Sequence, residues 1–270
     1  MRMNRFWIAL GFTLCACSHV TLSQDDLRRV HKPAFLARMD ESGNPHADVF
    51  RSDAVFRAKL TRMDAPEADR RLSAKVLQAV NRFEVGERLR AGTIAQLPAE
   101  PPWSNAASSA SVASALESFL VQNVPAHEPD YQLLAPLGVD AVVEFVVDDC
   151  GMHSANGKAG AFARGYGRMF FLNGGGEIWH KGFNVDQVRQ GTANLDPFVV
   201  SKDPSTLRQA MRTLLDAVSV DFARALQSDR GLVIHSSQPA PLPLDGNELE
   251  SPRDDTNKTG REPPADPSHP

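Results

Sequence analysis

The segment 148–153 (DDCGMH) places a thiol, an imidazole and two carboxylates close together in the chain. A thiolate with a base beside it is the arrangement of a cysteine nucleophile. Carboxylate and imidazole groups are also ligands for divalent metal ions. The segment therefore raises two catalytic hypotheses. One is a thiol nucleophile at Cys150 with His153 as its base, and the other is a metal ion held by Asp148, Asp149 and His153.

The surroundings of the segment argue against both hypotheses. Asp148 and Asp149 disfavour a second negative charge, so they raise the pKa of a thiol beside them. The sequence contains no HExxH, EF-hand or paired CxxC pattern, no GxSxG elbow and no phosphate-binding GxxxxGK[ST] loop. We therefore expect a strand end running into a polar loop, with no catalytic, cofactor-binding or metal-binding residue.

A second thiol, Cys17, ends an N-terminal segment that is typical of exported proteins. Arg2 and Arg5 make a positive start, and the stretch 6–14 (FWIALGFTL) that follows carries no charge. This stretch is too short for a membrane-spanning helix, which needs about 20 apolar residues. The segment therefore reads as a cleavable secretory signal.

The residues 14–17 (LCAC) resemble the lipobox of bacterial lipoproteins. The resemblance implies that residues 1–16 are removed as a signal peptide and that Cys17 receives a diacylglycerol and an acyl chain. Ser18, where Asp would favour the inner membrane, implies anchoring in the outer membrane with the chain facing the periplasm or the surface. An ordinary secretory signal cut near Ala16-Cys17-Ser18 is the alternative, and it would leave a soluble periplasmic or secreted protein.

Charge and cysteine usage limit the partners of the mature chain. The full sequence has 29 basic and 33 acidic residues. Removal of Arg2 and Arg5 with the signal leaves 27 basic residues and a net charge of −6. This balance disfavours a nucleic-acid partner, which needs a basic face. With Cys17 lipidated, Cys150 is the only thiol left, so no internal disulfide is expected. The expected contacts are the membrane, through the lipid, and an envelope protein, with no cofactor.

Residues 61–235 are predicted to form one α/β (α+β) domain, a small sheet packed by amphipathic helices. The β-branched run 139–147 (VDAVVEFVV) predicts a strand covered on both faces. The stretches 166–172 and 177–185 predict a C-terminal hairpin (about 166–185) around glycines that permit a tight turn. Apolar residues at helical spacing predict a long helix after Asp203-Pro204.

The first half of this domain is predicted to be helical. Asp64 and Glu67 have the spacing of a capping box before an amphipathic stretch. Residues 85–97 either continue that helix or form a second helix past Gly86. Serines at 108–111 suit the cap of a further helix that runs to about residue 122, and residues 131–136 predict one or two helical turns.

Both ends of the chain are weakly patterned. Residues 17–60 are a lipidated N-terminus and lead-in, in which 35–39 favours a short strand and 53–60 a strand or a helical turn. Residues 236–270 hold eight prolines and few large aliphatic side chains. Such a segment buries too little surface to offset its ordering entropy, so we expect a disordered tail.

The residues 138–142 (GVDAV) and 176–179 (GEIW) resemble the small α/β domains of periplasmic accessory lipoproteins, such as activators of cell-wall synthases and curli-secretion lipoproteins. The resemblance implies a fold class and transfers no catalytic residue, because those domains are largely non-enzymatic. Proteins that share a fold often differ in function, so a similar fold alone does not assign one.

These observations predict a lipid-anchored, non-catalytic binding or accessory module of the cell envelope. The alternative is an envelope hydrolase that uses Cys150 and His153, or a metal near Asp148 and Asp149. A third interpretation is a structural spacer in which the anchor and the tail matter more than the domain.

Overall fold

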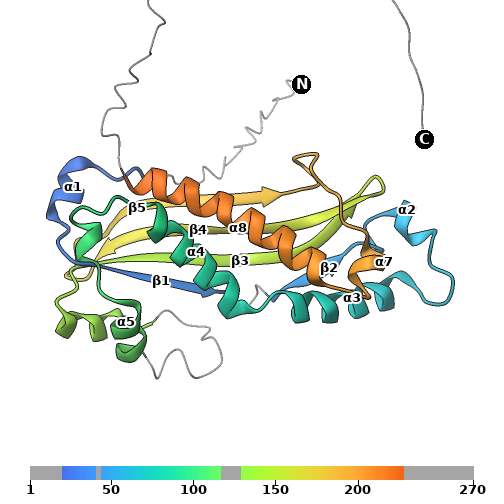
Figure 1. The fold of residues 1–270 in the computed structure, drawn as a ribbon, viewed down its shortest axis with the longest axis horizontal. Helices are drawn as coiled ribbons and strands as arrows, with labels where there is room; N and C mark the ends of the chain where they lie inside the picture. Colours follow the sequence, from blue (N-terminus) through green and yellow to red (C-terminus); the bar gives the residue numbers. More distant parts are fainter. Residues whose placement is uncertain (1–19, 41–43, 117–128, 228–270) are drawn as a thin grey trace, which may run out of the picture. The chain divides into compact units, whose positions relative to one another are not determined.

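The computed structural model describes residues 20–40, 44–116 and 129–227. Within these ranges one five-stranded sheet is packed by helices (Figure 1). The expected α/β fold is therefore confirmed. No helix among the described residues combines the length and the apolar character needed to cross a bilayer. The predicted tail at 236–270 and the signal segment lie outside the described residues.

The elements follow one another along the chain in this order: α1 (Gln24–Arg29), β1 (Pro33–Met39), β2 (His46–Asp48), α2 (Ala54–Arg57), α3 (Ala65–Ala79), α4 (Arg82–Gln96), η2 (Trp103–Asn105), α5 (Ser109–Ala115), η3 (Tyr131–Leu137), β3 (Ala141–Ala155), β4 (Lys158–Phe171), β5 (Glu177–Asp186), α7 (Pro197–Val200) and α8 (Ser205–Leu226).

The sheet has the order β1-β3-β4-β5, and β2 pairs with the far end of β3. Both β1 and β2 run parallel to β3, whereas β3, β4 and β5 are antiparallel. The short strand expected at 35–39 is confirmed as β1. The lead-in thus contributes two strands to the sheet, and the α/β fold begins before residue 61.

Strand β3 is longer than the predicted strand at 139–147. It continues to Ala155 and includes the whole segment 148–153. The expected polar loop at that segment is therefore wrong. The chain turns back only at Asn156 and Gly157, whose φ angles of 54° and 72° are those of a tight hairpin turn. A β-bulge between Val147 and Asp149 interrupts the register with β4.

The hairpin predicted at 166–185 is confirmed as β4 and β5. Gly174 and Gly176 in its turn have φ angles of 79° and 72°, which glycine adopts without steric cost. The long helix after Asp203-Pro204 is confirmed as α8.

The helices of the first half are confirmed with changed boundaries. Asp64 caps α3 by accepting the backbone N–H of Glu67 at 2.9 Å. A second helix, α4, begins at Arg82 behind the cap residue Asn81, and therefore before Gly86. Ser108 caps α5, and the rest of that predicted helix, from residue 117 on, lies outside the described residues. The stretch at 53–60 contains the helical turn α2, and 131–136 forms η3.

Two apolar clusters lie on the two faces of the sheet. The larger cluster packs α3, α4 and α8 against side chains such as Phe35 and Phe145. The smaller cluster packs α5 and η3 against side chains on the opposite face of the same strands, such as Leu36 of β1 and Val142 of β3. Because successive side chains of a strand point to opposite faces, β1 is covered by α4 on one side and by α5 on the other.

A buried carboxylate, Asp69 on α3, holds the segment after β2 in place. Its two oxygens accept the backbone N–H groups of Val49, Phe50 and Arg51, each at 2.9 Å. The side chain of Arg51 adds an ion pair at 3.4 Å. Backbone donors that are buried need an acceptor, so this carboxylate connects α3 to the loop.

We expect Asp69→Ala to lower the free energy of unfolding by about 3 kcal/mol, because three amides lose a charged acceptor. Urea denaturation measures the effect. The control is Asp25→Ala on α1, whose carboxylate is 89% exposed and pairs with Arg28. Exposed pairs of this kind contribute little, so equal losses of stability in the two variants would refute the assignment.

Candidate functional site

The structure separates Cys150 from His153. The Cys150 side chain is fully buried in the apolar cluster beneath the helices. His153 lies on the other face of β3, where its Nε2 is 2.8 Å from Oδ1 of Asp186. Burial, and then the charge of Asp149, raise the pKa of the Cys150 thiol to about 12. The pairing of this thiol with His153, which the alternative nucleophile hypothesis requires, is therefore not formed.

Among the described residues, Asp148, Asp149 and His153 do not come together as the metal hypothesis requires. Asp149 forms an ion pair with Arg164 at 2.6 Å and lies 3.3 Å from His46 Nδ1, and burial raises the pKa of Asp148. No group of three or more potential metal ligands lies together within the described part of the chain. The predicted lipidation site, Cys17, lies outside the described residues and stays a prediction.

The most distinctive surface of the described chain is the free edge of β1. The N–H of Asp40, just after the strand, donates to Val147 O at 2.9 Å, so its backbone faces β3. Backbone groups of successive residues alternate in direction. Those of Phe35, Ala37 and Met39 therefore point away from β3, and no described residue pairs with them.

The start of this edge already has a backbone partner. Pro33 O accepts the N–H of Ala107 at 2.9 Å. Ala107 lies just before α5, and the chain then turns away into that helix. Beyond Pro33, no strand among the described residues pairs with this edge. At the opposite side of the sheet, His180 of β5 forms a two-bond bridge with Val20.

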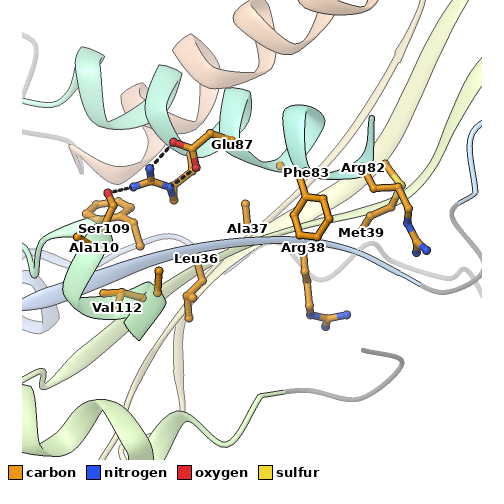
Figure 2. A pocket seen from close by; sticks show the side chains of 14 residues that line it. Leu36, Ala37, Arg38, Met39, Arg82, Phe83, Glu87, Ser109, Ala110 and Val112 are labelled. Atoms are coloured by element: carbon orange, nitrogen blue, oxygen red, sulfur yellow. Dashed lines mark hydrogen bonds and ion pairs between the residues drawn. The ribbon is translucent and has the colours of Figure 1, made fainter. Parts of the chain in front are cut away.

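Two helices border the free edge and convert it into a groove (Figure 2). The cavity measures about 500 Å³, which is within the range of ligand pockets. Its floor is the stretch 35–39 of β1, and its walls come from α4 and α5. The lining residues from the two helices are Arg82, Phe83, Gly86, Glu87 and Arg90 on α4, and Ser109, Ala110, Val112 and Ala113 on α5.

Small side chains leave the groove open. Ala110 and Ala113 line the α5 wall, and Gly86 lines the α4 wall. Gly86 also allows α4 to approach the strand, since a Cβ at this position would lie 3.2 Å from the Cβ of Ala37. Phe83 is the exception: it is 60% exposed, and its ring lies over the strand beside the groove (Figure 2). The groove therefore has an exposed aromatic side chain and an open backbone edge.

The arginines of the groove differ in how their charge is balanced. Arg90 forms an ion pair with Glu87 and donates to Ser109. Arg38 points to the other face of the sheet, where its Nε is 2.7 Å from Oε1 of Glu144. Arg82 forms no ion pair with a described residue: it donates from Nη2 to Asp40 O at 2.9 Å, and its buried Nε has no hydrogen-bond partner.

A buried ion cluster keeps Arg38 in this orientation. The fully buried Glu144 also accepts from Arg168 Nε and from the Tyr131 hydroxyl, both at 2.6 Å. Burial and the Glu144 charge raise the pKa of the Tyr131 phenol, so Tyr131 stays protonated and acts as a donor. The cluster lies on the face of the sheet that carries η3, and of its four members only Arg38 lines the groove.

The sequence predicts the strand that forms the groove but not the groove itself. The stretch 35–39 is expected to be a strand, and 108–111 to open a helix. Nothing in the sequence indicates that β1 is an edge strand, because its partner β3 begins about a hundred residues later. The sequence features that relate to the groove are the small residues Gly86, Ala110 and Ala113, which line it.

Comparisons with known proteins give weak structural likenesses only. No protein-family model matches the chain, and no curated protein matches its sequence. A PelC dodecamer from Paraburkholderia phytofirmans is similar at 10% identity with a TM-score of 0.29, covering 75% of this chain and 92% of that one. The LpoB C-terminal domain from Salmonella enterica has 9% identity, a TM-score of 0.24 and coverages of 58% and 83%.

A third structure, the hypothetical protein CT253 from Chlamydia trachomatis, has 12% identity, a TM-score of 0.28 and coverages of 70% and 96%. Structural similarity at TM-scores this low gives no basis for assigning a function to this chain. The short matches noted in the sequence, 138–142 and 176–179, lie around the start of β3 and the start of β5.

The buried thiol makes a testable prediction. At pH 8 a thiol with a pKa of about 12 is ionised in about one molecule in ten thousand. In a chain with Cys15→Ser and Cys17→Ser, we expect Cys150 to resist alkylation by iodoacetamide until denaturant unfolds the protein. Intact mass gives the labelled fraction. Rapid labelling of the folded chain would show an accessible thiolate and would revive the nucleophile hypothesis.

Proposed function

We propose that this chain is a membrane-anchored lipoprotein that acts as a non-catalytic binding or accessory module of the cell envelope. The observation that carries the proposal is the groove along the free edge of β1, an open backbone edge between two helices. The lipobox-like residues 14–17 supply the anchor, and the envelope is the compartment that they imply.

The composition of the groove suits recognition. Its polar side chains are three arginines, one glutamate and one serine, and it has no thiol or imidazole among its lining residues. A groove that combines apolar side chains with a few polar groups and an exposed aromatic side chain is typical of a binding site. The rival hydrolase hypothesis loses its main support, since Cys150 is buried on the face of the sheet opposite His153.

The anchor and the groove have separate roles in the proposal. Two acyl chains on Cys17 give stable attachment to a bilayer, whereas a single chain gives marginal attachment. Ser18 after the cysteine favours the outer membrane. The groove then selects an envelope protein held near that membrane. A structural spacer would need only the anchor and the tail, and its function would survive loss of the groove.

Lipidation is tested by feeding alkyne-labelled palmitate to cells that produce the full chain. We expect label on the wild-type protein and on Cys15→Ser, and none on Cys17→Ser, because the acyl chains depend on the Cys17 thiol. The Cys17→Ser protein should also leave the membrane fraction. An unlabelled wild-type chain, or label that persists in Cys17→Ser, would contradict the anchor.

The docking surface is tested in the same cells with a photocrosslinking phenylalanine analogue. We expect the analogue at Phe83 to form a discrete protein adduct, because this side chain borders the groove and is 60% exposed. The matched control is Leu77 on α3, which is 49% exposed and does not line the groove. No adduct from position 83, or equal adducts from both positions, would count against the groove.

A further inference from the structure

We propose that the partner fills this groove with an extended peptide strand that hydrogen-bonds to β1 along Phe35, Ala37 and Met39 and places an acidic side chain at Arg82. The inference rests on the proposed function and adds to it the kind of ligand. It predicts that recognition goes mainly through the peptide backbone, as in other cases where a strand is added to a sheet edge.

The first support is the pattern of open backbone groups. Phe35, Ala37 and Met39 each present an N–H and a C=O outward, and no described residue pairs with them. A row of alternating donors and acceptors is matched by another extended backbone, which carries the same groups at the same spacing. The bond from Ala107 to Pro33 shows that this edge already accepts a backbone partner at its first residue.

The second support is the shape of the groove. Helix α4 lies along one side of the strand and α5 along the other (Figures 1 and 2). The walls leave a cavity of about 500 Å³ above the edge. A second copy of the domain would have to bring its own sheet edge between these helices, together with the helices that cover that sheet. A single extended strand has no such layers, so the groove favours a peptide over a sheet-to-sheet dimer.

The third support is the uneven charge along the groove. At the end near α5, Arg90 is neutralised by Glu87. At the other end Arg82 has no carboxylate partner among the described residues, and its buried Nε lacks an acceptor. A cation in this state favours an anionic group within reach. The geometry therefore places an aspartate or glutamate of the partner near the C-terminal end of β1.

The alternation of a strand also sets which partner side chains meet which wall. Successive residues of an added strand point to opposite faces. One set would contact the α4 wall near Phe83, and the other the α5 wall near Val112. The α5 wall is small and mainly apolar, and the α4 wall presents Phe83 between charged side chains. We therefore expect small or β-branched apolar residues in the middle of the partner strand and the acidic residue at one end.

The test uses the full lipoprotein purified in detergent and a displayed library of random twelve-residue peptides. Peptides selected on the protein are synthesised, and their affinity is measured by fluorescence anisotropy. We expect sequences with apolar residues around an acidic one. We also expect N-methylation of alternate backbone amides to weaken binding at least tenfold, since it removes donors without changing side chains.

Two pairs of variants locate the peptide. Ala113→Trp fills the groove and should weaken binding at least tenfold, whereas Ser114→Trp, at the neighbouring exposed position outside the groove, should not. Arg82→Gln should weaken binding about tenfold and make it less sensitive to salt. Arg71→Gln on α3, an exposed arginine paired with Glu67, is its control.

Amide hydrogen exchange on the wild-type protein gives an answer that does not depend on the variants. Bound peptide should slow the exchange of the Phe35, Ala37 and Met39 amides. No selected peptide, no protection, or binding unchanged by Ala113→Trp would overturn the inference. The proposed function would still stand if lipid and a crosslinked partner were found in cells. If the protein is not lipidated but still binds the peptide, the proposed membrane anchor is wrong and the proposed peptide-binding groove is supported.

Discussion

The parallel pairing of β1 with β3 is the constraint on which the rest of the structure depends. Parallel strands cannot be joined by a tight turn, so the chain must cross over between them. The residues between Met39 and Ala141 form this crossover. They supply β2 to the sheet, α3 and α4 to one of its faces, and α5 and η3 to the other. The same connection that makes the pairing possible therefore builds both walls of the groove.

The buried Glu144 shows how this arrangement is held together across three strands. Its carboxylate joins Arg38 of β1 to Arg168 of β4. Burying a charge is costly unless it is paired and hydrogen-bonded, and here both carboxylate oxygens have cationic donors. The cluster also turns the Arg38 guanidinium away from the groove. Arg82 is consequently the arginine of the groove that has no balancing carboxylate among the described residues.

The sequence predicts the local elements well and their long-range pairing poorly. The hairpin at 166–185 carries its own turn signal, and the caps at Asp64 and Ser108 mark helix starts. The Asn156-Gly157 pair is an equally strong hairpin signal, yet the polar segment 148–153 before it suggests a loop. The structure shows why the pattern misleads: the bulge after Val147 shifts the alternation, so Cys150 faces the core although aspartates precede it.

The groove could not be predicted from the sequence, for a related reason. Whether a strand lies at the edge or in the centre of a sheet depends on contacts between residues far apart in the chain. The run 35–39 has the same apolar character in either position, and its partner β3 lies about a hundred residues away. Local propensity and periodicity carry no information on that distance. Only the small residues Gly86, Ala110 and Ala113 are a visible trace, because they leave space that larger side chains would fill.

An open edge is normally a liability, since it invites pairing with other chains. Proteins usually blunt such an edge with charges, proline or a covering segment. Here the bond from Ala107 to Pro33 closes the first residue of the edge. The next residues pair with no other part of the described chain and are recessed between two helices. Recessing excludes a flat sheet edge while it admits a single strand. The fold thus limits uncontrolled association and keeps the edge available to one kind of ligand, which is the property that a strand-binding module requires.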